Sequence, residues 1–220
     1  MSIPENIQQL KKELPKNVSL IAVSKTKPAA DLKDAYGAGQ REFGENKIQE
    51  MAEKWAQLPK DISWHMIGHV QSNKVKYMAE FVSLIHGVDS LKLLQEIDNQ
   101  AKKYHRVIDC LLQIKIAEED TKFGLSTTDA SNLLKSETFR SLQNIRVVGL
   151  MGMATFTSDQ TQIKQEFGFL KSYFDMLKNS ETANFKPTVL SMGMSQDYAL
   201  AIQSGSNMVR IGSKIFGERE

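Results

Sequence analysis

Short apolar runs alternate along the chain with longer segments in which apolar residues recur every three or four positions. The short runs are rich in branched aliphatic residues, as buried strands are, and the longer segments have the spacing of amphipathic helices. A strand followed by a helix recurs about eight times, and no connection is a long linker rich in Pro, Gly or Ser. Such alternation predicts a parallel sheet with right-handed crossovers.

An amphipathic helix over 3–14 precedes the first strand. Eight units then favour a closed (β/α)8 TIM barrel, although an open doubly wound sheet also fits the pattern. We therefore expect residues 1–220 to form a single α/β domain, a barrel with an extra N-terminal helix. The predicted strands are 20–25, 41–45, 62–67, 82–87, 107–116, 145–150, 188–190 and 207–211. The other predicted helices are 28–36, 46–58, 72–81, 90–104, one that starts at 126, 159–179 and 196–203.

Composition places the chain among ordinary globular proteins, with 41% hydrophobic and 25% charged residues. The net charge of +2 is too small to indicate a nucleic-acid or membrane-surface partner. Cys110 is the only cysteine and lies in an apolar run, which suggests a buried thiol and a reducing compartment. The first residues lack a signal-peptide core, and no window is apolar enough to span a bilayer. We expect a cytoplasmic protein.

Lys25 ends the first predicted strand abruptly, after the apolar run 20–23. A lysine there points to the edge of an α/β barrel where ligands bind. Partial burial lowers the pKa of a lysine, so that it can act as a neutral amine toward aldehydes. The alternative is a lysine that only reaches out to water.

The last two strands lead into loops rich in small residues, 190–195 and 210–213. Barrels commonly bind phosphate at these two places, through exposed backbone N–H groups and helix N-termini. Arg210 ends the last strand, next to the first strand in a closed barrel, and its guanidinium can only donate hydrogen bonds. An ion pair with a carboxylate is the competing role for Arg210. A phosphorylated aldehyde with a ring acceptor, such as pyridoxal 5′-phosphate (PLP), satisfies all these groups, with Lys25 as its Schiff base.

Four motifs extend this interpretation. They are Ala22-Val23-Ser24-Lys25-Thr26-Lys27-Pro28, Phe43-Gly44-Glu45-Asn46, Trp64-His65-Met66-Ile67-Gly68-His69 and the stretch Leu190 to Gly217 with Ser-Met-Gly-Met-Ser and Val-Arg-Ile-Gly-Ser. In these the sequence resembles the pyridoxal phosphate homeostasis proteins, also described as proline synthase co-transcribed homologues. That family is similar to the N-terminal barrel of bacterial alanine racemase.

The resemblance implies a cofactor site for PLP. Lys25 would form the Schiff base and Arg210 would face the pyridine nitrogen. Ser191, Gly212 and Ser213 would hold the phosphate, with Met192 adding a backbone contact.

Four further positions have open roles. Asn46 follows the second strand and could face the cofactor or cap the helix after it. His65 and His69 are four apart, but the first lies in a strand and Gly68 breaks a helix there, so we expect no metal site. His69 could border the pocket or make a structural hydrogen bond. Lys122 is expected in a loop near the barrel mouth.

Two departures from the family pattern stand out. Lys115 replaces the usual Asn and would add a cation near the cofactor if it points inward. Gly152-Met153-Ala154 stands where the family often has Pro after Gly-Leu-Met, which could loosen that loop.

The resemblance implies a protein that binds PLP for cofactor supply and for the balance of amino and keto acids, without strong catalysis. PLP-dependent apoenzymes are possible partners, and we expect a monomer, with a dimer as the alternative. A PLP-dependent amino-acid racemase is the second hypothesis. Two arguments oppose it: we expect no second β domain to supply a base, and Arg210 would keep the ring nitrogen unprotonated. A barrel acting on a sugar phosphate without PLP is a third.

Overall fold

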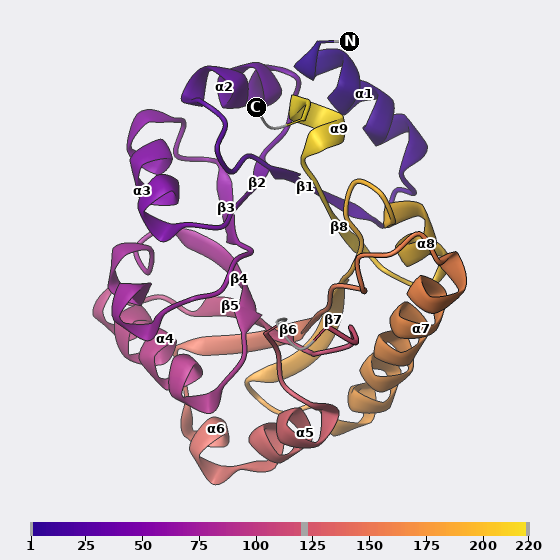
Figure 1. Cartoon of the computed structure of the whole chain (residues 1–220). Coiled ribbons are helices and arrows are strands. Elements are labelled where there is room, and N and C mark those ends of the chain that lie inside the picture. Colours follow the sequence, from indigo (N-terminus) through magenta and orange to yellow (C-terminus); the bar gives the residue numbers. More distant parts are fainter. Residues whose placement is uncertain (1, 120–122, 219–220) are drawn as a thin grey trace.

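The strands close into an eight-stranded parallel barrel in the order β1 to β8, with helices around the outside (Figure 1). The computed structural model describes residues 2–119 and 123–218. Strands β1 (Ser19–Val23) and β8 (Met208–Ile211) complete the ring, with Leu20 opposite Val209. The predicted TIM barrel is confirmed, and the open doubly wound sheet is excluded by this closing pair.

Each strand leads to a helix or helical turn that packs outside the ring. The remaining strands are β2 (Glu42–Glu45), β3 (Ser63–Met66), β4 (Val82–Val88), β5 (Ile108–Gln113), β6 (Ile145–Met151) and β7 (Phe185–Ser191). The α-helices are α1 (Ile3–Glu13), α2 (Ala29–Gly37), α3 (Ile48–Gln57), α4 (Leu91–Lys103), α5 (Thr127–Lys135), α6 (Glu137–Ser141), α7 (Gln160–Leu177), α8 (Tyr198–Gln203) and α9 (Ser213–Phe216). The 3-10 helices are η1 (Ser72–Tyr77) and η2 (Lys178–Ser180).

Side-chain caps fix where several helices begin. The Ser90 hydroxyl accepts from the backbone N–H of Leu93 at the start of α4. Ser126 does the same for α5, and the Asp159 carboxylate accepts two N–H groups of the first turn of α7. Each cap satisfies a donor that has no partner within its helix.

Several predicted boundaries are wrong. The segment 72–81 forms only η1, a 3-10 helix, rather than an α-helix. The predicted strand 188–190 is part of a longer β7 that contains Pro187. Proline does not donate to a ladder, and Pro187 lies where the pairing of β6 with β7 is irregular, so a strand tolerates it there. The short helices α6 and α9 were not predicted.

The apolar core has two parts. The larger one lies between the barrel and its helices, and includes the fully buried Phe43, Trp64 and Phe167. The smaller one fills part of the barrel interior with the buried side chains of Ile21, Leu84, Leu111, Val148, Met151 and Met208. The interior also holds buried polar side chains, which lead toward the carboxyl ends of the strands.

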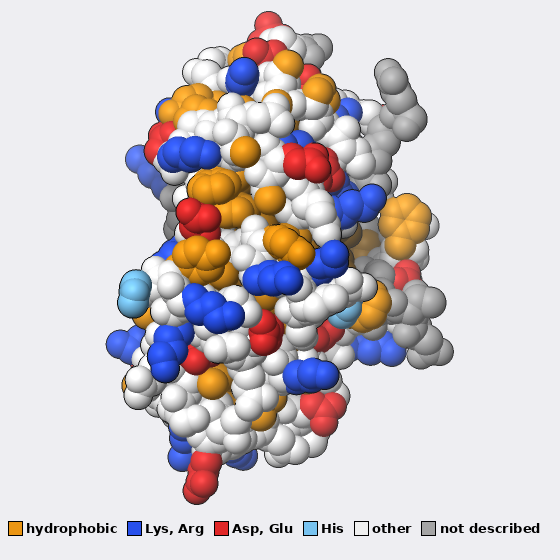
Figure 2. All heavy atoms as spheres, turned by 90° about the vertical axis from the view of Figure 1, so that its left-hand side faces the viewer, with side chains coloured by type: hydrophobic (Ala, Val, Ile, Leu, Met, Phe, Trp, Pro, Cys, Tyr) orange, Lys and Arg blue, Asp and Glu red, His pale blue; other side chains and the backbone are white. Residues whose placement is uncertain are grey.

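Basic and acidic side chains are mixed on the face that carries α3 and α4, with small hydrophobic patches between them (Figure 2). This mixture agrees with the small net charge of +2. Among the helices of the described residues, none combines the length and the apolar character needed to cross a membrane.

Candidate cofactor site

A cavity of about 830 Å³ opens where the strands end at their carboxyl termini. Five of the seven predicted site residues line it: Lys25, Asn46, Arg210, Gly212 and Ser213. They come from the first, second and last strands, whose ends the barrel brings together. Side chains that the sequence did not single out complete the wall, including Lys27, Ile67, Gln113, Phe123, Met153, Phe156, Ile163, Met194, Asp197 and Leu200.

Lys25 occupies the second position of a tight turn directly after β1. The backbone N–H of Lys27 donates to the Ser24 carbonyl at 3.1 Å, which closes the turn. Thr26 has φ of 67°, a left-handed conformation that a β-branched residue rarely adopts. A turn of this kind needs support from its surroundings. We call residues 24–27 the lysine turn.

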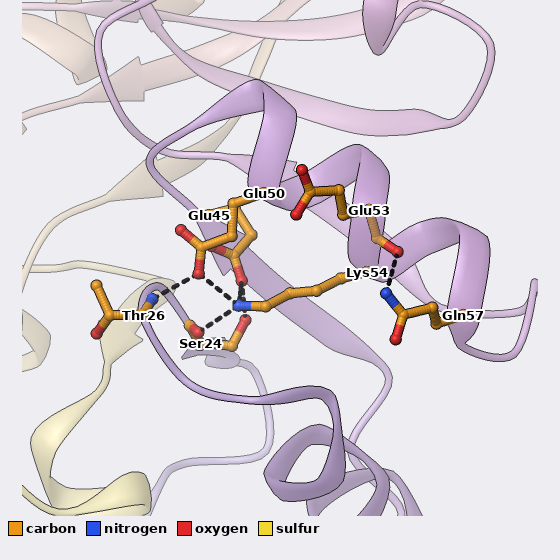
Figure 3. Close-up of polar contacts among 7 residues, drawn as sticks. All are labelled: Ser24, Thr26, Glu45, Glu50, Glu53, Lys54 and Gln57. Atoms are coloured by element: carbon orange, nitrogen blue, oxygen red, sulfur yellow. Dashed lines mark hydrogen bonds and ion pairs between the residues drawn. The ribbon is translucent and has the colours of Figure 1, made fainter.

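A buried lysine of α3 supplies that support (Figure 3). The ammonium of Lys54 donates to the Ser24 carbonyl at 2.8 Å and to Glu45 Oε1 and Glu50 Oε1 at 2.7 Å each. The Ser24 hydroxyl donates to Glu45 Oε1 at 2.6 Å, and the Thr26 N–H donates to Glu50 Oε1 at 2.6 Å. The clamp of Lys54, Glu45 and Glu50 therefore holds the backbone on both sides of Lys25.

Glu45 is the most buried member of this clamp, with no exposed surface. Burial raises the pKa of its carboxyl above the ordinary value, and the hydrogen bonds from Lys54 and Ser24 oppose that rise. Within the described residues, its second oxygen, Oε2, has no hydrogen-bond partner. The ammonium of Lys54 is thus the charge that makes an ionised Glu45 tolerable there.

Arg210 is held through its side chain. Nη1 donates to the Ser191 carbonyl at 2.9 Å and to the Ser191 hydroxyl at 2.7 Å, and Nη2 donates to the Gly152 carbonyl at 3.2 Å. These acceptors are neutral, so the ion pair considered from the sequence is not what fixes this guanidinium. Burial lowers its pKa to about 10, against a smaller rise from Asp197. Arg210 therefore stays cationic at neutral pH.

Two predicted site residues do not reach the cavity wall. Ser191 is fully buried, and its hydroxyl lies between Arg210 and Nδ1 of His86, 3.2 Å away. Met192 is also fully buried, and its backbone N–H donates to the Met208 carbonyl and to the hydroxyl of Ser206. The expected phosphate contacts of Ser191 and Met192 are therefore corrected. The first residue points inside the barrel, and the N–H of the second belongs to the contacts between β7 and β8.

The wall near Gly212 is built from the loops after β7 and β8. Gly212 donates its N–H to the hydroxyl of Ser195 at 3.3 Å, which ties the two loops together. The first loop does not lead straight into a helix, because Asp197 accepts the N–H of Met194 at 2.6 Å in a turn before α8. Ser213 begins α9, where backbone N–H groups lack partners within the helix. Gly212 and Ser213 line the cavity, while their contact with a phosphate stays a prediction; Ser195 also lines it, and the sequence did not single out its hydroxyl.

Asn46 lines the cavity and does not cap the next helix. Lys47 occupies the cap position of α3, so the capping role considered for Asn46 is wrong, while a role toward the cofactor stays a prediction. Gly68 allows this arrangement, since a Cβ there would lie 2.6 Å from the carbonyl oxygen of Asn46. No other residue fits without moving that backbone.

His69 lines the cavity and also makes a structural contact. Its Nδ1 lies 3.2 Å from Asp89 Oδ2, and its ring stacks on Phe123 with centroids 4.2 Å apart. His65 lies inside the barrel instead, where only 4% of its surface is exposed. The two histidines thus have different surroundings. Lys122 lies outside the described residues.

The two departures from the family pattern differ in position. Lys115 is exposed and is not among the described residues that line the cavity, so the inward orientation considered for it is wrong. Met153 and Ala154 do line the cavity. Gly152 has no room for a side chain, since a Cβ would lie 2.5 Å from Leu170.

Comparison with known proteins finds the same fold. The family model "Alanine racemase, N-terminal domain" matches residues 2–220. The solved structure of PipY from Synechococcus elongatus PCC7942 without PLP has a TM-score of 0.92 at 36% identity, and covers 98% of this chain and 100% of that one. The PLP-bound structure of PipY has a TM-score of 0.89 at 35% identity, with the same coverage. The chain is thus a barrel of the alanine racemase N-terminal type.

A curated relative makes the family more specific. The pyridoxal phosphate homeostasis protein of Pasteurella multocida (strain Pm70) is 40% identical over an alignment of 224 positions, which covers 99% of this chain and 95% of that protein. This chain belongs to the pyridoxal phosphate homeostasis protein family.

Proposed function

We propose that this protein binds PLP covalently through Lys25 and serves PLP homeostasis without strong catalysis. The observation that carries the proposal is that Lys25, in the turn after β1, and Arg210, on the neighbouring β8, line one cavity together with Gly212 and Ser213. An amine for the aldehyde, a donor for the ring nitrogen and a cradle of small residues for the phosphate fit the three functional groups of PLP. The PLP-bound structure of PipY supports the same ligand.

The charge of Arg210 supports the noncatalytic part of the proposal. Bound PLP supplies an electron sink to the groups attached to it, and this sink is strongest when the ring nitrogen is protonated. A guanidinium that stays cationic at neutral pH donates to that nitrogen and opposes its protonation. Cofactor supply to PLP-dependent apoenzymes and the balance of amino and keto acids fit a protein that holds PLP in this way. We also propose that residues 1–220 form one functional unit that acts as a monomer. A cytoplasmic location is in keeping with a single, buried cysteine.

An absorbance spectrum with added PLP tests the proposal. We expect a visible band in the wild type, fixed by borohydride on Lys25, and loss of that band in Lys25→Ala. Lys27→Ala is the matched control, since Lys27 lines the same cavity but is the last residue of the turn, two positions after Lys25. An adduct mapped to another lysine would overturn the assignment of Lys25.

A second candidate function is amino-acid racemisation. The observation in its favour is His69, which lines the cavity and is paired with Asp89 as a base would be. Chiral chromatography after long incubation with L-alanine distinguishes the two functions. Turnover of order 1 per second would favour the racemase, and we expect far less.

A further inference from the structure

A row of polar side chains crosses the barrel interior behind the cavity. Arg210 Nη1 lies 2.7 Å from Ser191 Oγ, which lies 3.2 Å from His86 Nδ1. His86 Nε2 lies 3.0 Å from His65 Nδ1, and His65 Nε2 is 3.8 Å from Glu42 Oε1. The row connects β8 with β2 through β7, β4 and β3. We call these five residues the interior relay.

The chemistry of its first member fixes the direction of the relay. A guanidinium only donates, so the Ser191 hydroxyl accepts from Arg210 and is left with its own hydrogen to donate. His86 Nδ1 is the acceptor within reach, which places the ring hydrogen of His86 on Nε2. That N–H donates to His65 Nδ1, and the remaining N–H of His65 faces the Glu42 carboxylate. The reverse direction would point a lone pair of His65 at a carboxylate.

Both histidine rings are neutral at neutral pH, as this direction requires. Burial lowers the pKa of His65 to about 4. It also lowers the pKa of His86 well below its ordinary value, and the charges of His65 and Arg210 act in the same sense. Two neutral rings at neutral pH can each donate once and accept once, as the relay needs.

We propose that His86 and His65 are positioning residues for Arg210, acting through the hydroxyl of Ser191. Each link turns its acceptor end toward the guanidinium, so the aligned dipoles stabilise a buried cation whose hydrogen bonds within the described residues go to neutral groups. They also keep the Ser191 oxygen available to accept the hydrogen bond from Arg210 Nη1, and this bond fixes the position of that nitrogen. This role rests on the proposed function, because it matters to PLP only if Arg210 faces the ring nitrogen.

The tautomers are measurable in the protein without PLP. Nitrogen-15 NMR of histidine-labelled protein near neutral pH should show His86 and His65 neutral with the hydrogen on Nε2. The chain has 4 histidines, and the variants His69→Asn and His105→Asn assign the signals. A hydrogen on Nδ1 of His86, or a charged ring, would overturn the relay whether or not the protein binds PLP.

Binding of two aldehydes tests the effect on Arg210. PLP has a ring nitrogen, and the corresponding phosphorylated hydroxybenzaldehyde has none. We expect Ser191→Ala and His86→Phe each to weaken PLP binding about tenfold, the size of one hydrogen bond to a charged group, and to affect the nitrogen-free aldehyde much less. Because both changes break one chain, the double variant should bind PLP no worse than the weaker single variant.

Ser206→Ala is the matched control for Ser191→Ala. Its hydroxyl is also buried between β7 and β8, but it bonds to the backbone of Leu190, Met192 and Met208 instead of the relay. We expect Ser206→Ala to lower stability and to leave the ratio of the two affinities unchanged. Equal losses for both aldehydes in the Ser191 and Ser206 variants would mean that the relay only stabilises the fold. A wild type that binds neither aldehyde would contradict the proposed function while leaving the NMR result intact.

Discussion

Lys25, in the turn after β1, and Arg210, on the neighbouring β8, line the same cavity, but the barrel holds them in opposite ways. The clamp of Lys54, Glu45 and Glu50 contacts the backbone on either side of Lys25. Arg210 is fixed through its own guanidinium, by acceptors on both Nη atoms. A residue that must form and break a bond benefits from a fixed backbone, whereas a residue that must present a constant charge benefits from a fixed side chain.

The two supports also differ in charge. The clamp is a buried ion pair, with 8% of the Lys54 side chain exposed and none of the Glu45 side chain. The interior relay uses neutral histidines next to a cation. Since a buried ion pair becomes costly when one partner is lost, and a neutral ring becomes costly when it must ionise, the two supports should fail under different conditions.

Removing the clamp lysine should have the largest effect on stability. Lys54→Met leaves Glu45 buried without its cation, so we expect a loss of about 3 kcal/mol in the free energy of unfolding, measured by urea denaturation. Formation of the visible PLP band should also slow, while the histidine tautomers stay unchanged. The double variant Lys54→Met with Glu45→Gln removes both charges and should recover part of the loss. A double variant as unstable as the single one would show that packing, not charge, explains the effect.

The substitution Gly212→Asp tests the part of the cavity wall that lies next to the lysine turn. A Cβ at Gly212 would lie 3.2 Å from the carbonyl oxygen of Val23, just before the lysine turn, and a carboxylate would add a like charge near a phosphate. We expect PLP binding to weaken by at least about 2 kcal/mol, roughly thirtyfold. Pyridoxal, which lacks the phosphate, should lose much less in an equilibrium titration. Equal losses for both aldehydes would place the phosphate elsewhere and leave Gly212 as a residue of the fold.

Acid should weaken the support around Arg210. The pKa of His65 falls from 6.5 to about 4 in the folded protein because the ring is buried. A lowered pKa means that its contribution to stability is complete above pH 6.5 and is lost as pH falls toward 4. Between about pH 7 and pH 5 this one group should cost about 2 kcal/mol.

Urea denaturation at the two pH values measures this cost. His65→Gln should show a smaller acid loss than the wild type by that amount. The exposed His105, at φ of 53°, is the control, since His105→Asn keeps a conformation that Asn tolerates and should keep the full acid loss. An identical acid loss in wild type and His65→Gln would mean that His65 is not buried as a neutral ring.

The sequence predicted the barrel and the positions of Lys25 and Arg210 near the carboxyl ends of its strands, because each depends on a short, strong pattern. An apolar run that ends in Lys25, and another that contains Arg210, place these residues at the ends of neighbouring strands. Ser191 was misplaced because the predicted strand ended at 190, whereas β7 continues to Ser191. A shift of one residue changes the side to which a strand residue points.

The residues that support Lys25 and Arg210 could not be predicted in this way. Lys54 stands in a charged stretch of α3, and its sequence context is that of an exposed helix face. His86 is a polar residue in a mostly apolar strand, which is also what an ordinary core histidine looks like. Their roles depend on contacts between residues 9 to 105 positions apart in the sequence, and local periodicity carries no information on such pairs.

The smallest effect is expected at Lys115, which the family pattern made a candidate for a change in cofactor electrostatics. Its exposed side chain is absent from the described cavity wall, so its charge is screened by water and salt before it reaches the ligand. Lys115→Asn should therefore change PLP affinity less than about twofold and stability by less than about 0.5 kcal/mol. Titration with PLP at low and high salt measures both the affinity and its screening. A tenfold change at low salt would show that the charge of Lys115 acts on the ligand together with the basic residues that line the cavity.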